Sequence, residues 1–301
     1  MKIKIYGTRG SHAAPSEEYR EFYTSKYGAN TTSALVTSKN DDLIVLDGGT
    51  GIIPLGNDLV SSGRYKNAGL RHKLLFTHNH SDHIEGVPFF KPLYDGRNSF
   101  DVYGYREPRL LEELLMARQE QFYFPVAYEE PHTTEKVPFM MAKKKHHMLN
   151  GPNIEDTVKI ENERTNHPGG CVAYKFTEDN RSIVFGGDHE FGDESIDSKL
   201  VELYKGAKII IQDCQYTPEE RCPEKYGLKA FPKRGWGHSD FEQVIEFMTR
   251  VNPEILILTH HDPDHDDKFI EKMHERVSLY AKEKGLKSKV LMAQPGMEFE
   301  V

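Results

Sequence analysis

The sequence predicts an α/β fold with sheets in the interior and helices on the outside. Short runs rich in Ile, Val and Leu recur along the 301 residues, and helical stretches lie between several of them. No repeat of fixed period and no low-complexity linker interrupts this order, so we expect one domain spanning residues 1–301. Hydrophobic residues make up 37% and charged residues 29% of the chain, which is a globular composition.

The predicted strands share short length, apolar character and a Gly, Asn or Asp close by. They are Lys2–Tyr6, Ser33–Thr37, Leu43–Leu46, Lys73–Thr77, Ser99–Tyr103, Cys171–Phe176, Ser182–Phe185, Lys208–Gln212 and Ile255–Thr259.

Three helices are predicted from apolar spacing and from end signals. Pro108–Gln121 has a proline at its start and leucines at helical spacing. Asp240–Arg250 opens with Ser239 or Asp240 as the N-cap and ends before a proline. Asp266–Lys284 begins with acidic residues and stops at Gly285, which suits the helix dipole and a left-handed cap.

Charge and cysteine content narrow the function classes. The net charge of −8 argues against broad nucleic-acid binding. Apolar runs such as Ile255–Leu258 are far shorter than the ~20 residues of a membrane-spanning helix, and Met1–Ile5 alternates like a strand. Three cysteines are too few and too odd in number for a disulfide framework. We therefore expect a reduced, cytoplasmic protein without a membrane partner.

Residues 120–148 depart from the alternating order. The segment mixes aromatic residues, two glutamates and the basic run Lys143–His147. A plain surface hairpin accounts for this composition, and a mobile lid or an arm of a homodimer are the functional alternatives.

A histidine-rich motif directly follows the predicted strand Lys73–Thr77. Within six residues it places His78, His80, Asp82 and His83. A sharp loop at a strand end can aim these side chains into one pocket, with His78 and His80 on one metal ion and Asp82 and His83 on a second. Imidazole and carboxylate ligands suit Zn, Mn or Fe.

This His-x-His-x-Asp-His pattern resembles that of the metallo-β-lactamase superfamily. The resemblance implies an αβ/βα four-layer sandwich and extends to four further motifs in the expected order. Asp47 before a Gly-Gly turn would hold the histidine loop in place without binding metal. His167 would complete the first metal site, Asp188 would bridge both ions, and His260 would complete the second, although His261 is an adjacent alternative.

One branch of the superfamily, that of ribonuclease Z-like and cyclic-nucleotide phosphodiesterase-like enzymes, carries an additional histidine. His238, in Gly235–Asp240, resembles it, and Asp213 at the end of a predicted strand resembles its acidic partner. The resemblance implies that His238 contacts the scissile phosphate and donates a proton. We take His238, Asp213 and Asp82 as catalytic residues. Arg9, in a Gly-flanked loop of the same branch, could face an anionic substrate or form a structural ion pair.

The resulting expectation is a hydrolase with two divalent metal ions, most simply Zn, with Mn or Fe as alternatives. A bridging Asp188 favours phosphodiester hydrolysis by two metal ions. The chain lacks the long Gly- and Pro-rich basic arm of ribonuclease Z, so a small phosphodiester such as a cyclic nucleotide or cyclic sugar phosphate is expected in place of tRNA. Hydrolysis of a thioester or lactone would not need His238 paired with Asp213, and a di-iron sensor is a non-hydrolytic alternative.

Overall fold

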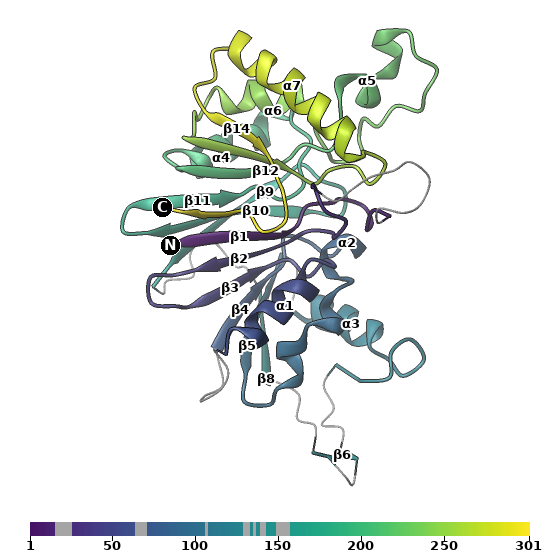
Figure 1. Cartoon of the computed structure of the whole chain (residues 1–301), viewed down its shortest axis with the longest axis vertical. Helices are drawn as coiled ribbons and strands as arrows, with labels where there is room; N and C mark the ends of the chain where they lie inside the picture. The colour runs from purple at the N-terminus through teal and green to yellow at the C-terminus, as the bar shows by residue number, and fades with distance from the viewer. Residues whose placement is uncertain are drawn as a thin grey trace.

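Two sheets face each other and helices cover their outer sides in the computed structural model (Figure 1). The structure describes residues 1–15, 26–63, 71–105, 108–128, 133–134, 137–138, 143–148 and 157–301. This α/β sandwich confirms the fold class predicted from the sequence. Within the described residues no helix is both long and apolar enough to cross a membrane.

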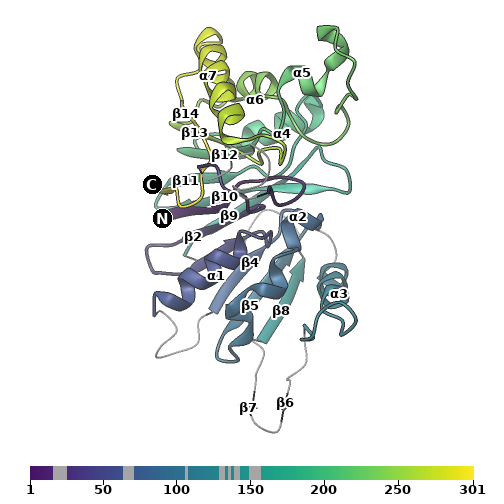
Figure 2. The ribbon, with the colours of Figure 1, turned by 45° about the vertical axis from the view of Figure 1, so that its right-hand side comes forward.

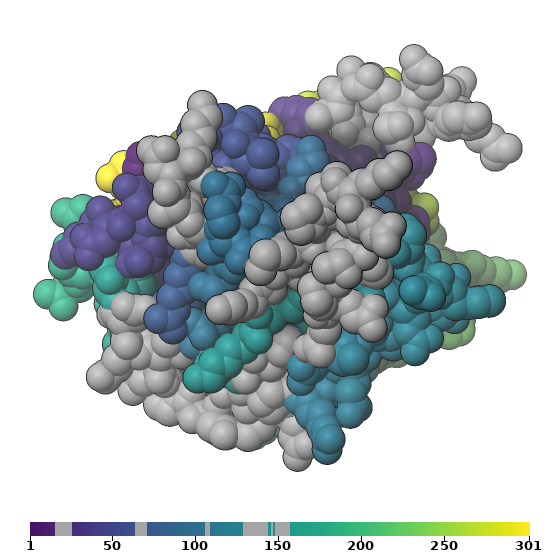
Figure 3. Space-filling view, turned by 90° about the horizontal axis from the view of Figure 1, so that it is seen from below, coloured from purple at the N-terminus to yellow at the C-terminus, as the bar shows by residue number. Residues whose placement is uncertain are grey.

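The first sheet is built mainly from the first half of the chain. Its order is β15 (Glu298–Glu300), β1 (Lys2–Gly7), β2 (Ser33–Thr37), β3 (Leu43–Leu46), β4 (Arg71–Leu75), β5 (Ser99–Gly104) and β8 (Lys143–Met148). Strands β3, β4, β5 and β8 run parallel, and β1 to β3 are antiparallel neighbours. Helices α1 (Ile52–Ser61) and α3 (Pro108–Arg118) belong to this half, and Figure 3 shows it from below.

The second sheet comes from the second half of the chain. Its order is β14 (Lys289–Met292), β13 (Ile255–Thr259), β12 (Ile209–Asp213), β11 (Arg181–Phe185), β10 (Cys171–Glu178) and β9 (Lys159–Thr165), with β11 to β14 parallel. Helices α4 (Glu194–Tyr204), α6 (Phe241–Met248) and α7 (Asp267–Glu283) cover its outer face.

The remaining elements are short. They are helices α2 (Ser81–Ile84) and α5 (Pro218–Arg221), the 3₁₀ turns Val87–Phe89, Lys91–Tyr94 and Pro223–Tyr226, and the hairpin strands β6 (Thr133–Thr134) and β7 (Val137–Pro138).

Alternating side chains explain the layered packing. In β3, Ile44 and Leu46 join the core between the two sheets, whereas Leu43 and Val45 join the core beneath α1 and α3. Strand β12 behaves the same way: Ile209 and Ile211 face the first sheet and Ile210 packs under the helices. Because successive residues of a strand point to opposite faces, a strand buried on both sides is apolar throughout.

Helix ends agree closely with the end signals in the sequence. Asp240 caps α6 through the backbone N–H groups of Glu242 and Gln243, and Asp266 caps α7 through that of Phe269. Gly285 follows α7 with a φ of +73°. The three cysteines are free and buried.

The segment 120–148 is described in part. Its basic run belongs to β8, which pairs in parallel with β5, so these residues form the edge of the first sheet. The predicted features at Glu129–His132 lie outside the described residues. Phe122 and Tyr123 are exposed, and the role of the segment as a lid or a dimer arm stays a prediction.

The parallel strands of both sheets end at the same side of the molecule, which gathers the motif residues (Figure 2). Asp47 follows β3 and His78 lies just beyond β4. From the second sheet, Asp188 lies just beyond β11, Asp213 ends β12, and His260 follows β13. Residues separated by up to about 200 positions in sequence therefore meet across the sandwich, as expected at the carboxyl ends of parallel strands.

Candidate metal centre

Three groups of side chains in the described part of the chain could hold a metal ion, and two neighbouring ones contain the predicted ligands. The first comprises His78, His80 and His167. The second comprises Asp82, His83, Asp188 and His260, all buried. The third, Asp188, Asp213, His238 and His260, overlaps the second of these. Within each group the donor atoms lie within 4.8 Å of one another. The structure thus brings together every residue that the sequence proposed as a metal ligand.

The second group has the spacing of a tetrahedral site. The Nε2 atoms of His83 and His260 lie 3.3 Å apart. Each of these nitrogens is also 3.3 Å from Oδ2 of Asp188. Bonds of about 2.0–2.1 Å to a tetrahedral zinc ion separate neighbouring ligand atoms by roughly 3.3 Å. These separations therefore match the edges of such a site.

Asp188 lies between the two groups. In the first group, Nδ1 of His80 is 2.9 Å from Nε2 of His167. Oδ2 of Asp188 is 3.5 Å from Nε2 of His78 and 3.9 Å from Nε2 of His167, in addition to its contacts with the second group. One carboxylate oxygen is therefore close to donor atoms of both groups, as a bridging ligand requires.

Outer hydrogen bonds fix which ring nitrogen faces inward in three of the histidines, His83, His167 and His260. Nδ1 of His83 donates to Asp47 at 2.9 Å, and Nδ1 of His167 donates to the carbonyl oxygen of Gly237 at 2.9 Å. Nδ1 of His260 is 3.2 Å from the side-chain oxygen of Gln215. Because each Nδ1 carries the proton, the Nε2 lone pairs converge on one another.

Converging lone pairs and carboxylates need a positive charge between them. Nε2 of His78 is buried and has no hydrogen-bond partner. Burial opposes protonation of His83 and His260, yet the neighbouring carboxylates raise the pKa of His83 well above its usual value and that of His260 to about 9. The same attraction for positive charge suits divalent cations, so the residues present fit a dinuclear metal site.

His238 and Asp213 lie beside the two groups. Nδ1 of His238 is 2.9 Å from Oδ2 of Asp213, which also accepts the backbone N–H of His189 at 3.1 Å. The His238 ring lies 4.8 Å from the ring of His260 and 5.0 Å from that of His167, centroid to centroid. The predicted catalytic pair is therefore assembled next to both candidate metal positions.

Tight backbone geometry positions several of these side chains. Asp47 and His260 have positive φ values, 53° and 62°, which are uncommon for residues with a Cβ and occur mainly where the surroundings enforce them. A Cβ on Gly10 would lie 2.1 Å from Nδ1 of His260, and one on Gly237 would lie 2.2 Å from Nδ1 of His167. Both glycines therefore allow a close approach to a histidine of the site.

The positions of His261 and Arg9 in the structure decide two questions that the sequence left open. His261 donates from Nε2 to the carbonyl oxygen of Ala293 and lies outside both groups, so His260 is the histidine that reaches them. The guanidinium of Arg9 is fully buried and donates to the carbonyl oxygens of Gly28, Asp262 and His265. Arg9 therefore braces the loop after His260 and does not face a substrate.

Three supporting residues escaped the sequence analysis. The Thr77 hydroxyl contacts both oxygens of Asp47 and Nδ1 of His78. Gln215 orients His260. The carboxylate of Glu190 accepts the backbone N–H groups of Gly235 and Gly237 and pairs with Arg221, so it holds the loop that leads to His238. The only signal in the sequence for these roles is that each residue lies close to a motif residue along the chain.

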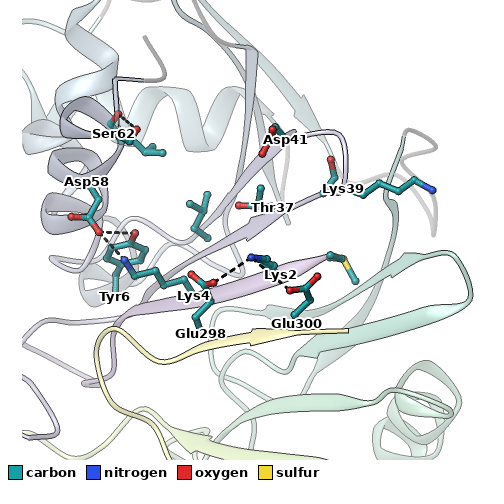
Figure 4. A pocket seen from close by; sticks show the side chains of 14 residues that line it. Lys2, Lys4, Tyr6, Thr37, Lys39, Asp41, Asp58, Ser62, Glu298 and Glu300 are labelled. Carbon is teal, nitrogen blue, oxygen red and sulfur yellow. Dashed lines mark hydrogen bonds and ion pairs between the residues drawn. The ribbon is translucent and has the colours of Figure 1, made fainter. Parts of the chain in front are cut away.

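A separate cavity lies away from the candidate metal centre. It measures about 650 Å³ and is lined by residues of β1, β2, α1 and β15 (Figure 4). Lys4 pairs with Asp58 at 2.8 Å, and Lys2 lies 3.6–3.7 Å from Glu298 and Glu300. Because these charges already pair with one another, the cavity offers little to a charged ligand. A smaller cavity of about 240 Å³ opens beside His78 and His80.

Two family models match the sequence. The beta-lactamase superfamily domain matches residues 62–261. The Zn-dependent metallo-hydrolase RNA specificity domain matches residues 237–290, which include His238 and His260. No curated protein matches the sequence.

Solved structures share the fold over the full chain. The metallo-beta-lactamase fold protein YhfI from Bacillus subtilis is 17% identical, with a TM-score of 0.67 and coverage of 100% of this chain and 99% of that one. Yeast PDE1 is 17% identical, with a TM-score of 0.64 and coverage of 100% and 99%. A diphosphatase from the PhnP family is 16% identical, with a TM-score of 0.61 and coverage of 100% and 97%.

Proposed function

The chain belongs to the metallo-β-lactamase superfamily of metal-dependent hydrolases, and within that superfamily we propose that it is a dinuclear phosphodiesterase acting on small phosphodiesters. The ligands would be His78, His80 and His167 on one ion and Asp82, His83 and His260 on the other, with Asp188 between them. Zinc is the ion that this set of imidazole and carboxylate donors suits best, with Mn or Fe as alternatives.

The observation that carries the proposal is the pair formed by His238 and Asp213. Hydrolysis of a phosphodiester expels an alkoxide, which needs a proton, and His238, whose ring lies near those of His167 and His260, would supply it. Asp213 accepts the Nδ1 proton at 2.9 Å, which orients the imidazole ring and would leave Nε2 to face the substrate. A thioester or lactone hydrolase would have little use for such a pair.

In the proposed hydrolysis of the phosphodiester, the residues of the site have distinct tasks. Bound divalent ions would act as Lewis acids toward the phosphoryl oxygens and toward the attacking water. Oδ2 of Asp82, held by the backbone N–H of Ser11 at 2.7 Å, would help to orient that water. The water oxygen bonds to phosphorus, the ester P–O bond breaks, and the leaving oxygen takes a proton from His238. The attacking water releases one proton to solvent, and His238 takes one proton back from solvent, so protons balance over the cycle.

A singly charged diester suits the site better than a dianionic monoester. Lys233 reaches the hydrogen-bond network behind His260, but its Nζ lies 3.2 Å from Asp262, so its charge is largely compensated. Fold similarity to the PhnP-family diphosphatase and to yeast PDE1 is consistent with phosphate chemistry. The RNA specificity match at residues 237–290 supports an RNA phosphodiester as the second candidate substrate.

The experiment compares kcat/KM for bis(p-nitrophenyl) phosphate and p-nitrophenyl phosphate with zinc-, manganese- and iron-reconstituted protein. We expect at least a tenfold preference for the diester, which corresponds to about 1.4 kcal/mol in the barrier. A tenfold preference for the monoester would overturn the proposal. A thioester, a lactone and a precursor tRNA complete the panel, and faster turnover of any of these than of cyclic nucleotides would reassign the substrate class.

A further inference from the structure

The cavity of about 240 Å³ beside the first ligand group has an apolar wall that the hydrolytic step does not use. His78, Asn79 and His80 form the side nearest the metal centre. Tyr105, Leu110 and Leu114 line it together with Gly169 and Gly170. The described lining contains no Lys, Arg, Asp or Glu. The described lining therefore favours an uncharged group in this space next to the reacting phosphate.

Helix α3 presents two apolar stripes to different surroundings. Leu111 and Leu115 are buried in the core beneath the first sheet. Leu110 and Leu114, also four residues apart, line the cavity. Leu114 packs against that core as well, whereas Leu110 is 43% exposed, so Leu110 in particular is available to a ligand.

Tyr105 is the aromatic residue of the described lining. Its ring lies so close to the backbone of Gly170 that a Cβ there would be 2.4 Å from Cε1 of the ring. Gly170 also has a φ of +88°, a conformation that favours glycine. The Gly-Gly pair after His167 thus lets the aromatic side chain approach the loop that carries a ligand histidine.

The size of the cavity sets the size of the group. An apolar cavity of about 150 Å³ is enough to bind benzene. The volume here, about 240 Å³, accommodates one nucleobase or a comparable aromatic ring. An aromatic side chain and two leucines in the lining favour such a ring through aromatic contact and burial of apolar surface.

We propose that this cavity binds an uncharged aromatic ring attached to the scissile phosphate, so that the substrates are nucleoside or aryl diesters and not sugar phosphodiesters. The inference rests on the proposed phosphodiesterase function. Tyr105, Leu110 and Leu114 are then the residues that determine specificity. Asn79, at the junction of the cavity and the metal centre, can offer its amide to the polar edge of a base.

The test compares ligands that differ only in the ring. One pair is adenosine 3′,5′-cyclic phosphate and the 3′,5′-cyclic phosphate of 1-O-methylribose, and a second pair is methyl phenyl phosphate and dimethyl phosphate. Their inhibition constants are measured against hydrolysis of bis(p-nitrophenyl) phosphate by zinc-loaded protein. We expect the aromatic member of at least one pair to bind tenfold or more tightly. The first pair reports a nucleobase and the second an aryl ring.

Two variants assign the preference to the cavity. Tyr105→Ala removes the aromatic side chain, and Leu110→Trp, at a partly exposed helix position, fills the space without disturbing the core. Both should reduce the preference to less than threefold. Leu279→Ala, an exposed leucine on α7, is the matched control and should retain it. Equal binding within both pairs, or a preference that survives both variants, would overturn the assignment.

The outcomes separate this inference from the proposed function. If bis(p-nitrophenyl) phosphate is not hydrolysed, the phosphodiesterase proposal fails. The same ligand pairs are then measured by equilibrium dialysis, where turnover does not interfere. A ring preference that depends on Tyr105 would still support the cavity assignment, and its absence would reject it.

Discussion

Nδ1 of His167 donates a hydrogen bond of 2.9 Å to the carbonyl oxygen of Gly237, the residue directly before His238. A side chain of the first ligand group and the loop that carries the proposed proton donor are thereby joined. Glu190 strengthens the connection because its carboxylate accepts the N–H groups of Gly235 and Gly237. Disturbing this loop should therefore affect metal binding as well as proton transfer.

Gly237→Ala should disrupt the first ligand group. Its Cβ would lie 2.2 Å from Nδ1 of His167, at a φ of +89°. We expect at least tenfold weaker binding of one metal ion, measured by chelator competition. Gly235→Ala is a matched control because its φ of +80° imposes similar backbone strain while nothing lies within 4 Å of the new Cβ. Identical metal affinities in the two variants would contradict the link.

His238→Ala should lose activity while retaining metal. General acid catalysis contributes about 10²–10⁴-fold, and the loss should be larger for a nucleotide alkoxide than for nitrophenolate, which leaves without protonation. Asp213→Asn should lose less, and the double variant should resemble His238→Ala because Asp213 acts through the imidazole. Rates on both substrates and metal content are measured together, with His12→Ala as an exposed control. Equal losses on both substrates would point to phosphate binding without proton donation.

Reconstituted protein should contain about two equivalents of divalent metal by elemental analysis. Asp188→Ala should bind fewer or weaker ions because Oδ2 of Asp188 lies within 3.9 Å of nitrogen atoms in both groups. Glu202→Ala, at an exposed position on α4, should bind like the wild type. A single ion whose affinity is unchanged in Asp188→Ala would exclude the bridging role.

Acid should destabilise the protein in part through His72. Burial lowers the pKa of this β4 residue, which stacks on Phe100 at 4.9 Å, to about 4. The unfolded chain, with a pKa of about 6.5, then binds more protons than the folded chain between these values, so stability is fully present above pH 6.5 and falls toward pH 4.

Urea denaturation of chelator-treated protein measures this effect. Between pH 7 and pH 5 the wild type should lose about 2 kcal/mol more unfolding free energy than His72→Phe, as an upper estimate. His12→Phe, at an exposed position, should follow the wild type. A His72→Phe variant with the wild-type pH slope would show that His72 does not contribute.

Most buried strands could be predicted because apolar β-branched runs have few alternatives in a layered fold. Ser33–Thr37, Leu43–Leu46 and Ile255–Thr259 coincide with the observed strands. Lys143–Met148 and Lys159–Thr165 were missed because they are edge strands rich in charged residues, whose extended form depends on pairing with β5 and β10. Helix α4 was missed because its apolar face becomes evident only against the second sheet.

The candidate site was predictable where a motif is dense and unpredictable where support comes from afar. Three histidines and one aspartate lie within the six residues from His78 to His83, so this motif is recognisable from the sequence alone. By contrast, the bond of Gln215 to His260 and that of Glu190 to Gly237 join residues more than 40 positions apart. Arg9 illustrates the same limit, because a buried guanidinium that holds carbonyl groups has the same local sequence as one that faces a substrate.

The pairing of β15 with β1 has a consequence for biosynthesis. Lys2 lies opposite Glu300 in the first sheet, so β1 gains its outer neighbour only after residue 300 has left the ribosome (Figure 1). The His78–His83 loop emerges about 180 residues before His260, the histidine that faces His83. Such long-range contacts slow folding and prolong the exposure of nascent intermediates. Delivery of metal to this protein should therefore follow the emergence of His260 from the ribosome, and chaperones that shield nascent sheet edges should raise the yield of loaded protein.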